Sequence, residues 1–183
     1  MVTSLSSLFR ISLSRGANII PASDELAHVE SYIKIQQTRY SDVFEYRMDI
    51  QPETLDCATI KLVLQPIVEN SIYHSMKYMD GEGEIAIRAY IEDSGLYLEV
   101  ADNGLGMRQE AADRLLTEET PETASGKGNG VGLKNVNDRI RLYFGREYGL
   151  QIISEPDAGT TVRVRLPVRS VQQARDGSKG VDA

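Results

Sequence analysis

The chain has 183 residues, enough for one domain with a hydrophobic core of ordinary size. Its 41% hydrophobic and 26% charged residues are typical of a globular protein, and no apolar run approaches the roughly 20 residues that span a bilayer. The net charge of −7 argues against a general nucleic-acid-binding protein, and a single cysteine, Cys57, excludes an internal disulfide.

The N-terminal part reads as the end of a longer helix. Residues 1–14 place apolar side chains at helical spacing without a capping residue before them, which indicates a fragment of a larger protein. We therefore interpret residues 1–22 as the remnant of an upstream helix and a linker. The next one-sided apolar stripe predicts a helix over residues 23–39.

Strands are indicated where apolar and polar residues alternate. Turn-forming residues between the second and third of these segments, and between the last two, predict two hairpins. Strands that bury one face only favour a largely antiparallel sheet, so we predict an α/β (α+β) two-layer sandwich with helices on one face. The alternating segments are residues 44–50, 85–91, 96–101, 150–153 and 160–166.

Further helices are predicted over residues 58–78 and 108–116, and a third ends at Gly145. Pro66 lies inside the first of these helices, so we expect a bend there. The polar residues 169–183 are expected to form a disordered tail.

A first polar segment, Leu-Gln-Pro-Ile-Val-Glu-Asn-Ser-Ile-Tyr-His, covers residues 64–74. On the predicted helix, Asn70, His74 and Lys77 project together, because residues three and four apart share a face. The amide oxygen of Asn70 suits Mg²⁺, and His74 and Lys77 can reach phosphate oxygens. The alternative is a solvated helix face with an ordinary asparagine and histidine.

A second segment, Asp-Asn-Gly-Leu-Gly-Met, begins at Asp102, where a predicted strand ends. A carboxylate in this position can accept a hydrogen bond from the exocyclic amine of adenine. Gly104 and Gly106 allow the backbone to approach the ring closely, and Met107 packs either on a base or in the core. The alternative is a simple Asp-Asn-Gly turn.

A third segment, Gly-Lys-Gly-Asn-Gly-Val-Gly-Leu, covers residues 126–133 and precedes a helix. Exposed amides at a helix N-terminus form an anion site. The pattern is neither a Walker P-loop nor a dinucleotide fingerprint. A flexible linker is the alternative.

The order of these segments resembles the N box and the two glycine boxes of the GHKL ATPase superfamily, whose ATP-binding unit is the HATPase_c domain with its Bergerat-type fold. Residues 159–162, Gly-Thr-Thr-Val, resemble the last box of that superfamily. The N box with the following His74 is similar to sensor histidine kinases of the LytS/YesM-like group, as is the stretch 25–40. The resemblance covers roughly residues 5–168.

This resemblance implies that Asn70 coordinates magnesium and that Asp102 holds adenine, with Thr161 near the adenine end. His74 and Lys77 would help to hold the nucleotide, and residues 108–127 would form a mobile lid over it. The base pocket would be shaped by Gly104, Gly106 and Met107. The phosphates would be cradled by Gly128, Gly130, Val131, Gly132 and Leu133.

Two departures limit what can be carried over from the superfamily. Members that hydrolyse ATP carry a glutamate one helical turn before the asparagine, where this chain has Pro66, so we expect weak hydrolysis. Glu69 is a candidate catalytic residue, but it lies about 100° around the helix from Asn70. Neither of the two histidines, His28 and His74, has the Asn-Pro-His-Phe-like context of the phosphoacceptor.

We therefore expect residues 23–168 to be the ATP-binding catalytic domain of a two-component sensor histidine kinase, and residues 1–22 to derive from its phosphoacceptor and dimerisation helices. It would present Mg-ATP to a histidine outside this chain, for relay to the receiver domain of a response regulator. By itself the chain would not autophosphorylate. We expect a cytoplasmic domain, without nucleic-acid or membrane contacts, of an integral membrane sensor. The alternatives are a protein serine kinase of the anti-sigma-factor type and a nucleotide-gated interaction module without kinase activity.

Overall fold

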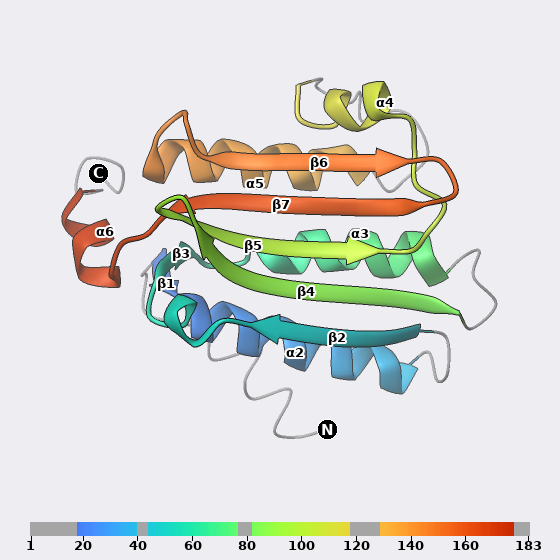
Figure 1. Ribbon diagram of the computed structural model, residues 1–183, viewed down its shortest axis with the longest axis horizontal. Helices are drawn as coiled ribbons and strands as arrows, with labels where there is room; N and C mark the ends of the chain where they lie inside the picture. Colours follow the sequence, from blue (N-terminus) through green and yellow to red (C-terminus); the bar gives the residue numbers. More distant parts are fainter. Residues whose placement is uncertain (1–17, 40–43, 77–81, 118–128, 178–183) are drawn as a thin grey trace.

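A five-stranded sheet organises the chain, as the computed structural model shows for residues 18–39, 44–76, 82–117 and 129–177 (Figure 1). Neighbouring strands are antiparallel, except that the edge strand β2 runs parallel to β4. The predicted mixed, mostly antiparallel sheet and both hairpins are therefore confirmed. In spatial order the strands are β2 (Phe44–Ile50), β4 (Gly83–Glu92), β5 (Gly95–Asp102), β7 (Gly159–Pro167) and β6 (Gly149–Glu155).

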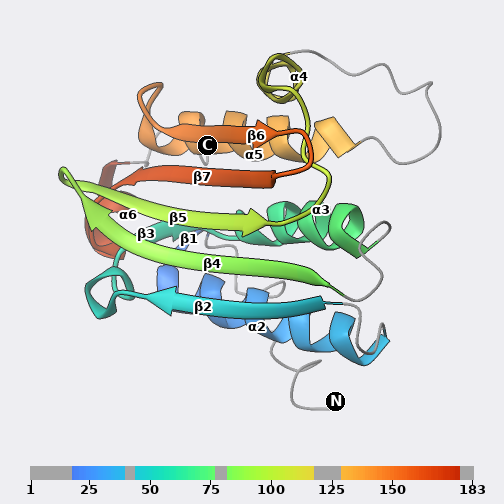
Figure 2. The same ribbon diagram turned by 45° about the vertical axis from the view of Figure 1, so that its right-hand side comes forward.

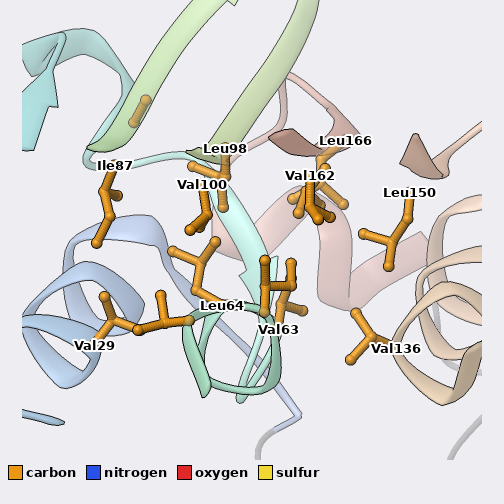
Figure 3. Close-up of a cluster of buried hydrophobic side chains, with 14 of the residues drawn as sticks. Val29, Val63, Leu64, Ile87, Leu98, Val100, Val136, Leu150, Val162 and Leu166 are labelled. Atoms are coloured by element: carbon orange, nitrogen blue, oxygen red, sulfur yellow. The ribbon is translucent and has the colours of Figure 1, made fainter. Parts of the chain in front are cut away.

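Three helices cover one face of this sheet (Figure 2). They are α2 (Ala22–Arg39), α3 (Leu64–Met76) and α5 (Asn129–Phe144). Val29, Leu64 and Val136 from these helices are buried against Val100 and Val162 of the sheet (Figure 3). Alternate strand residues thus supply one side of the core, as the sequence pattern predicts. In the described ranges, no helix has both the length and the apolar character needed to cross a bilayer.

A second, two-stranded sheet corrects one boundary predicted from the sequence, the start of α3. β1 (Ile19–Pro21) pairs antiparallel with β3 (Ala58–Ile60), whose three residues are all buried. The predicted helix start at residue 58 is therefore wrong, and the helix begins at Leu64. Pro66 then lies in the first helical turn, where a backbone N–H has no partner to lose, so the reason for the expected bend disappears.

The prediction of a disordered tail is wrong for residues 171–177, which form α6 (Val171–Gly177). Ala174 is buried, and the guanidinium of Arg175 donates a 2.8 Å hydrogen bond to the carbonyl of Ile19. The amide of Ala58 donates to the carbonyl of Arg169 at 2.7 Å. These contacts fix the polar segment on the small sheet, although its composition offers only one buried apolar side chain. Residues 178–183 lie outside the described part.

A buried carboxylate holds the start of α3. Glu25, on α2, is fully buried and accepts hydrogen bonds from the amides of Leu62, Val63 and Leu64 at 2.8–2.9 Å. These amides belong to the turn that enters the helix, where donors lack intrahelical partners and the helix dipole favours a negative charge. Burial raises the pKa of Glu25 above its ordinary value, while these donors and His28 act in the opposite direction.

We predict that Glu25→Ala lowers the free energy of unfolding by at least about 3 kcal/mol, because it leaves three amides at a buried helix start without an acceptor. Urea denaturation measures this change. The control is Glu30→Ala on the same helix, which removes an exposed pair with Lys34 and a long 3.4 Å hydrogen bond from the Tyr46 hydroxyl, and costs about 0.5–1 kcal/mol. Equal small losses in the two variants would contradict the proposed role of Glu25.

Candidate functional site

A cavity lies where the C-terminal end of β5 meets α3, α5 and the β6–β7 hairpin. It is mostly apolar with a few polar groups, as is usual for a small-molecule site. Its polar lining residues are Asn70, Ser71, Asp102 and Thr160. Its other lining residues are Ile67, Leu105, Gly106, Met107, Leu115, Leu133, Ile152 and Val162.

Asp102 is the last residue of β5, and the turn that follows the strand fixes its side chain. Its Oδ1 accepts a hydrogen bond from the amide of Gly104 at 3.0 Å. Asn103 fixes the same turn, because its side chain accepts from the amide of Glu84 at 2.7 Å and donates to the carbonyl of Glu82 at 2.9 Å. The Asp-Asn-Gly turn therefore exists, and it holds the carboxylate at the cavity wall.

The loop after Asp102 packs directly on the β6–β7 hairpin, backbone against backbone. Gly106 has φ +60°, and a Cβ on it would collide with the carbonyl of Glu155. Gly159 has φ +95°, and a Cβ there would collide with the carbonyl of Asp102. The amide of Asp157 donates to the carbonyl of Leu105 at 2.7 Å. The need for glycine at position 106 thus comes from this packing as well as from its place in the cavity wall.

Ser154 joins the loop to both hairpin strands, a role that the sequence analysis missed. Its hydroxyl accepts from the amide of Met107 at 2.9 Å and donates to the carbonyl of Gly159 at 3.0 Å. It also lies 2.8 Å from the hydroxyl of Thr160. Ser154 looks like an ordinary strand residue in the sequence, because its partners lie in other segments.

The expected position of Thr161 near the cavity is corrected by the strand register. Asp102 pairs with Thr160, and Ala101 pairs with Thr161. Since directly opposite residues share a face of the sheet, Thr160 joins Asp102 in the cavity lining, whereas Thr161 faces the other way. Counting the two-residue period of β7 back from the buried Val162 and Val164 would identify Thr160.

The N box helix brings some of its predicted residues to the cavity. Asn70 lines the wall, together with its neighbour Ser71. Glu69 is exposed and accepts a 2.7 Å hydrogen bond from the side chain of Gln65, away from the lining residues. Lys77 and the side chain of His74 lie outside the described residues, so their predicted contacts stay predictions.

The third glycine segment runs into α5, as predicted, because this helix begins at Asn129. Leu133 is buried and lines the cavity. Gly132 faces α3, since a Cβ on it would lie 3.9 Å from the Cβ of Pro66. Gly128 and the side chain of Val131 lie outside the described residues, and Gly130 is described only as part of the helix backbone.

Of the predicted lid, the structure describes residues 108–117, which include α4 (Gln109–Arg114). Gln109 fixes this helix to the edge strand β6. Its side-chain amide donates to the carbonyl of Ile152 at 2.8 Å, and its carbonyl accepts from the amide of Ser154 at 3.1 Å. The Gln109 side chain thus makes the two hydrogen bonds that a neighbouring strand would make to the edge of β6. Leu115, just beyond α4, lines the cavity.

The sequence matches two family models. The model described as histidine kinase-, DNA gyrase B- and HSP90-like ATPase matches residues 56–170. A histidine kinase model matches residues 1–44. The first match contains the whole cavity lining and most of the sheet.

Curated relatives are sensor kinases that are much longer than this chain. Sensor histidine kinase YesM of Bacillus subtilis (strain 168) is 34% identical over 170 residues, which are 93% of this chain and 28% of that protein. Sensor histidine kinase BtsS of Escherichia coli (strain K12) is 32% identical over 92% of this chain and 28% of its own length. The chain thus spans less than a third of these relatives.

Solved structures share the fold. The histidine kinase domain of the blue-light activated kinase from Erythrobacter litoralis EL346 has a TM-score of 0.60 at 15% identity, covering 98% of this chain and 77% of that one. The mycobacterial sensor histidine kinase MprB has a TM-score of 0.58 at 15% identity, covering 83% and 97%.

We predict that Gly106→Ala lowers the free energy of unfolding by at least about 2 kcal/mol, because it combines a left-handed backbone with a collision against the hairpin. Gly132→Ala is the matched control: its new methyl group meets ordinary contacts only, and alanine favours the helix by up to about 1 kcal/mol. Denaturant unfolding compares both variants with the unmodified chain. Similar stability of the two alanine variants would contradict this account of the loop.

Proposed function

Because the chain belongs to the family of histidine kinase-, DNA gyrase B- and HSP90-like ATPases, we propose that its cavity binds Mg-ATP and presents the γ-phosphate to a histidine outside this chain. The position of Asp102 is the observation that carries this proposal: a carboxylate at a strand end, inside a mostly apolar cavity. The similarity to sensor histidine kinases over more than nine tenths of the chain supports this substrate class.

The adenine is expected between apolar walls, with its exocyclic amine donating to Asp102. Met107 and Leu115 lie on the side of the loop and α4, and Ile152 and Val162 come from the sheet. A flat base buried among such side chains removes apolar surface from water, and the carboxylate gives it an orientation. In this arrangement the hydroxyl of Thr160, beside Asp102, is a second polar contact for the base.

The phosphates are expected between α3 and the N-terminus of α5, and the main-chain amides of Gly128, Gly130 and Gly132 are proposed to bind them. The residues fit a magnesium ion that arrives with the nucleotide, because Asn70 brings a hard amide oxygen to the cavity wall and Mg²⁺ takes few protein ligands. Such an ion neutralises phosphate charge. In the described ranges, no group of three or more histidine, cysteine or acidic residues is placed to hold a metal.

In the proposed reaction, catalysis comes mainly from positioning and charge neutralisation, as is general for phosphoryl transfer. Glu69 is poorly placed to act as a base on the nucleotide, because it is exposed and bonded to Gln65. The phosphoacceptor helices of the parent kinase and a response regulator receiver domain are the proposed partners. The parent protein is proposed to be a membrane sensor with this domain in the cytoplasm.

We predict that Asp102→Ala weakens ATP binding about 10- to 100-fold and reduces the preference for ATP over GTP, because a hydrogen bond to a charged group contributes about 1.5–3 kcal/mol. Isothermal titration calorimetry in the presence of magnesium measures both effects. Thr161→Ala, on the opposite face of the sheet, is the control and keeps the original affinity. Unchanged ATP affinity in Asp102→Ala would refute the proposed orientation of the base.

We predict that the chain alone acquires no stable acid-labile label from γ-labelled ATP, because its histidines lack the phosphoacceptor context. Added phosphoacceptor helices of the parent kinase should become labelled on histidine, and Asn70→Ala should abolish this transfer. Acid-stable phosphate on a serine of a partner would instead identify a protein serine kinase. Tight nucleotide binding without any transfer would identify an interaction module.

A further inference from the structure

A second hollow lies at the opposite end of the sheet from the nucleotide cavity. It has a volume of about 320 Å³ and is formed by the end of α5, the loop into β6 and the exposed face of β5 and β7. Tyr97, which lines it, is five residues along β5 from Asp102, or roughly 17 Å at about 3.4 Å per residue. Four arginines line it: Arg141, Arg146, Arg163 and Arg165. We call it the arginine hollow.

The charge of this hollow opposes that of the whole chain. Its lining contains four arginines and two glutamates, Glu92 and Glu147, which gives a local charge of +2, whereas the chain carries −7. All four cations are arginines and none is a lysine. The planar guanidinium group matches a carboxylate in a two-pronged hydrogen-bonding geometry, which the lysine ammonium group cannot do.

One of the four arginines already has a structural partner. Arg163 lies 2.9 Å from the buried carboxylate of Glu99, which also pairs with Arg88 at 3.2 Å. For Arg141, Arg146 and Arg165, no ion pair with a carboxylate occurs among the described residues, and all three side chains are exposed. One of the four arginines is therefore held by a buried carboxylate of the sheet, and the other three, on α5, the following loop and β7, are exposed.

Two tyrosines, Tyr97 and Tyr148, contribute aromatic surface to the hollow. The ring of Tyr97 stacks on Tyr90 with centroids 5.3 Å apart, and the guanidinium of Arg163 lies 6.0 Å from the Tyr97 centroid. Tyr148 lines the hollow from the loop before β6. Tyrosine and arginine are enriched at the energetic centres of protein interfaces, because they offer large contact areas and directed hydrogen bonds.

We propose that the arginine hollow docks an acidic peptide segment of a partner protein. The charge of the hollow selects carboxylates, and the spread of three exposed guanidinium groups over α5, a loop and β7 suits several carboxylates along a chain. A small anion would be better held by converging, buried donors. The docking site is separate from the proposed nucleotide site, so one can be tested without the other.

The test uses the full 183-residue chain and a fluorescent six-glutamate peptide in an anisotropy titration at low and physiological salt. We expect the peptide to bind, and the double variant R146E/R165E to weaken binding at least 10-fold. The control variant R47E reverses an exposed arginine on β2, at the other edge of the sheet, and should change the affinity less than twofold. A six-glutamine peptide should not bind.

Circular dichroism checks that R146E/R165E remains folded, and an ATP titration checks that it keeps its nucleotide affinity. We expect both to be unchanged, since both arginines lie far from the cavity. Equal losses in R146E/R165E and R47E would overturn the proposal, because they would indicate a nonspecific charge effect. Absence of peptide binding to the unmodified chain would also overturn it. The last titration uses inorganic pyrophosphate in place of the peptide. If pyrophosphate binds in the hollow while the peptide does not, the site is one for small anions and the proposal is wrong.

Discussion

The placement of α3 depends on one buried interaction, in which the Glu25 carboxylate on α2 accepts the three amides that enter the helix. This contact joins two helices whose bonded residues lie 37–39 positions apart in the chain. It also compensates for the burial of polar backbone groups at a helix start. Because α3 carries Asn70 and Ile67, the same contact determines where the helical wall of the nucleotide cavity stands. A structural carboxylate remote from the ligand therefore sets the geometry of the site.

The opposite wall is built by backbone packing rather than by side chains. Gly106 and Gly159 bring the loop after Asp102 against the β6–β7 hairpin, and Ser154 ties the two together through its hydroxyl. Gln109 then anchors α4 on the outer edge of β6. The side chains of Ser154 and Gln109 pair backbone groups of the loop, the hairpin and the edge strand β6 that would otherwise lack these partners.

Most strands of the five-stranded sheet could be predicted from the sequence, because the alternation of apolar and polar residues indicates which face of a strand is buried. The sequence analysis misplaced the start of α3, because Ala58–Ile60 is buried throughout and a short apolar run resembles a helix. It also predicted disorder where α6 forms, because this helix depends on contacts with β1 and β3, which are distant in the sequence. The motifs pointed to Asp102, Asn70 and Leu133, which line the cavity, and their roles in nucleotide binding stay predictions. No motif pointed to Glu25, Gln109 or Ser154, because their partners lie up to 47 residues away along the chain and no local pattern reveals them.

The central claim is that an adenine nucleotide occupies the cavity between α3, α4 and the β6–β7 hairpin. A crystal structure of the chain with magnesium and a non-hydrolysable ATP analogue tests it most directly. The account predicts the purine amine within hydrogen-bonding distance of Asp102 and the phosphates beside the N-terminus of α5. A nucleotide bound anywhere else on the molecule, or a cavity closed by side chains, would contradict it.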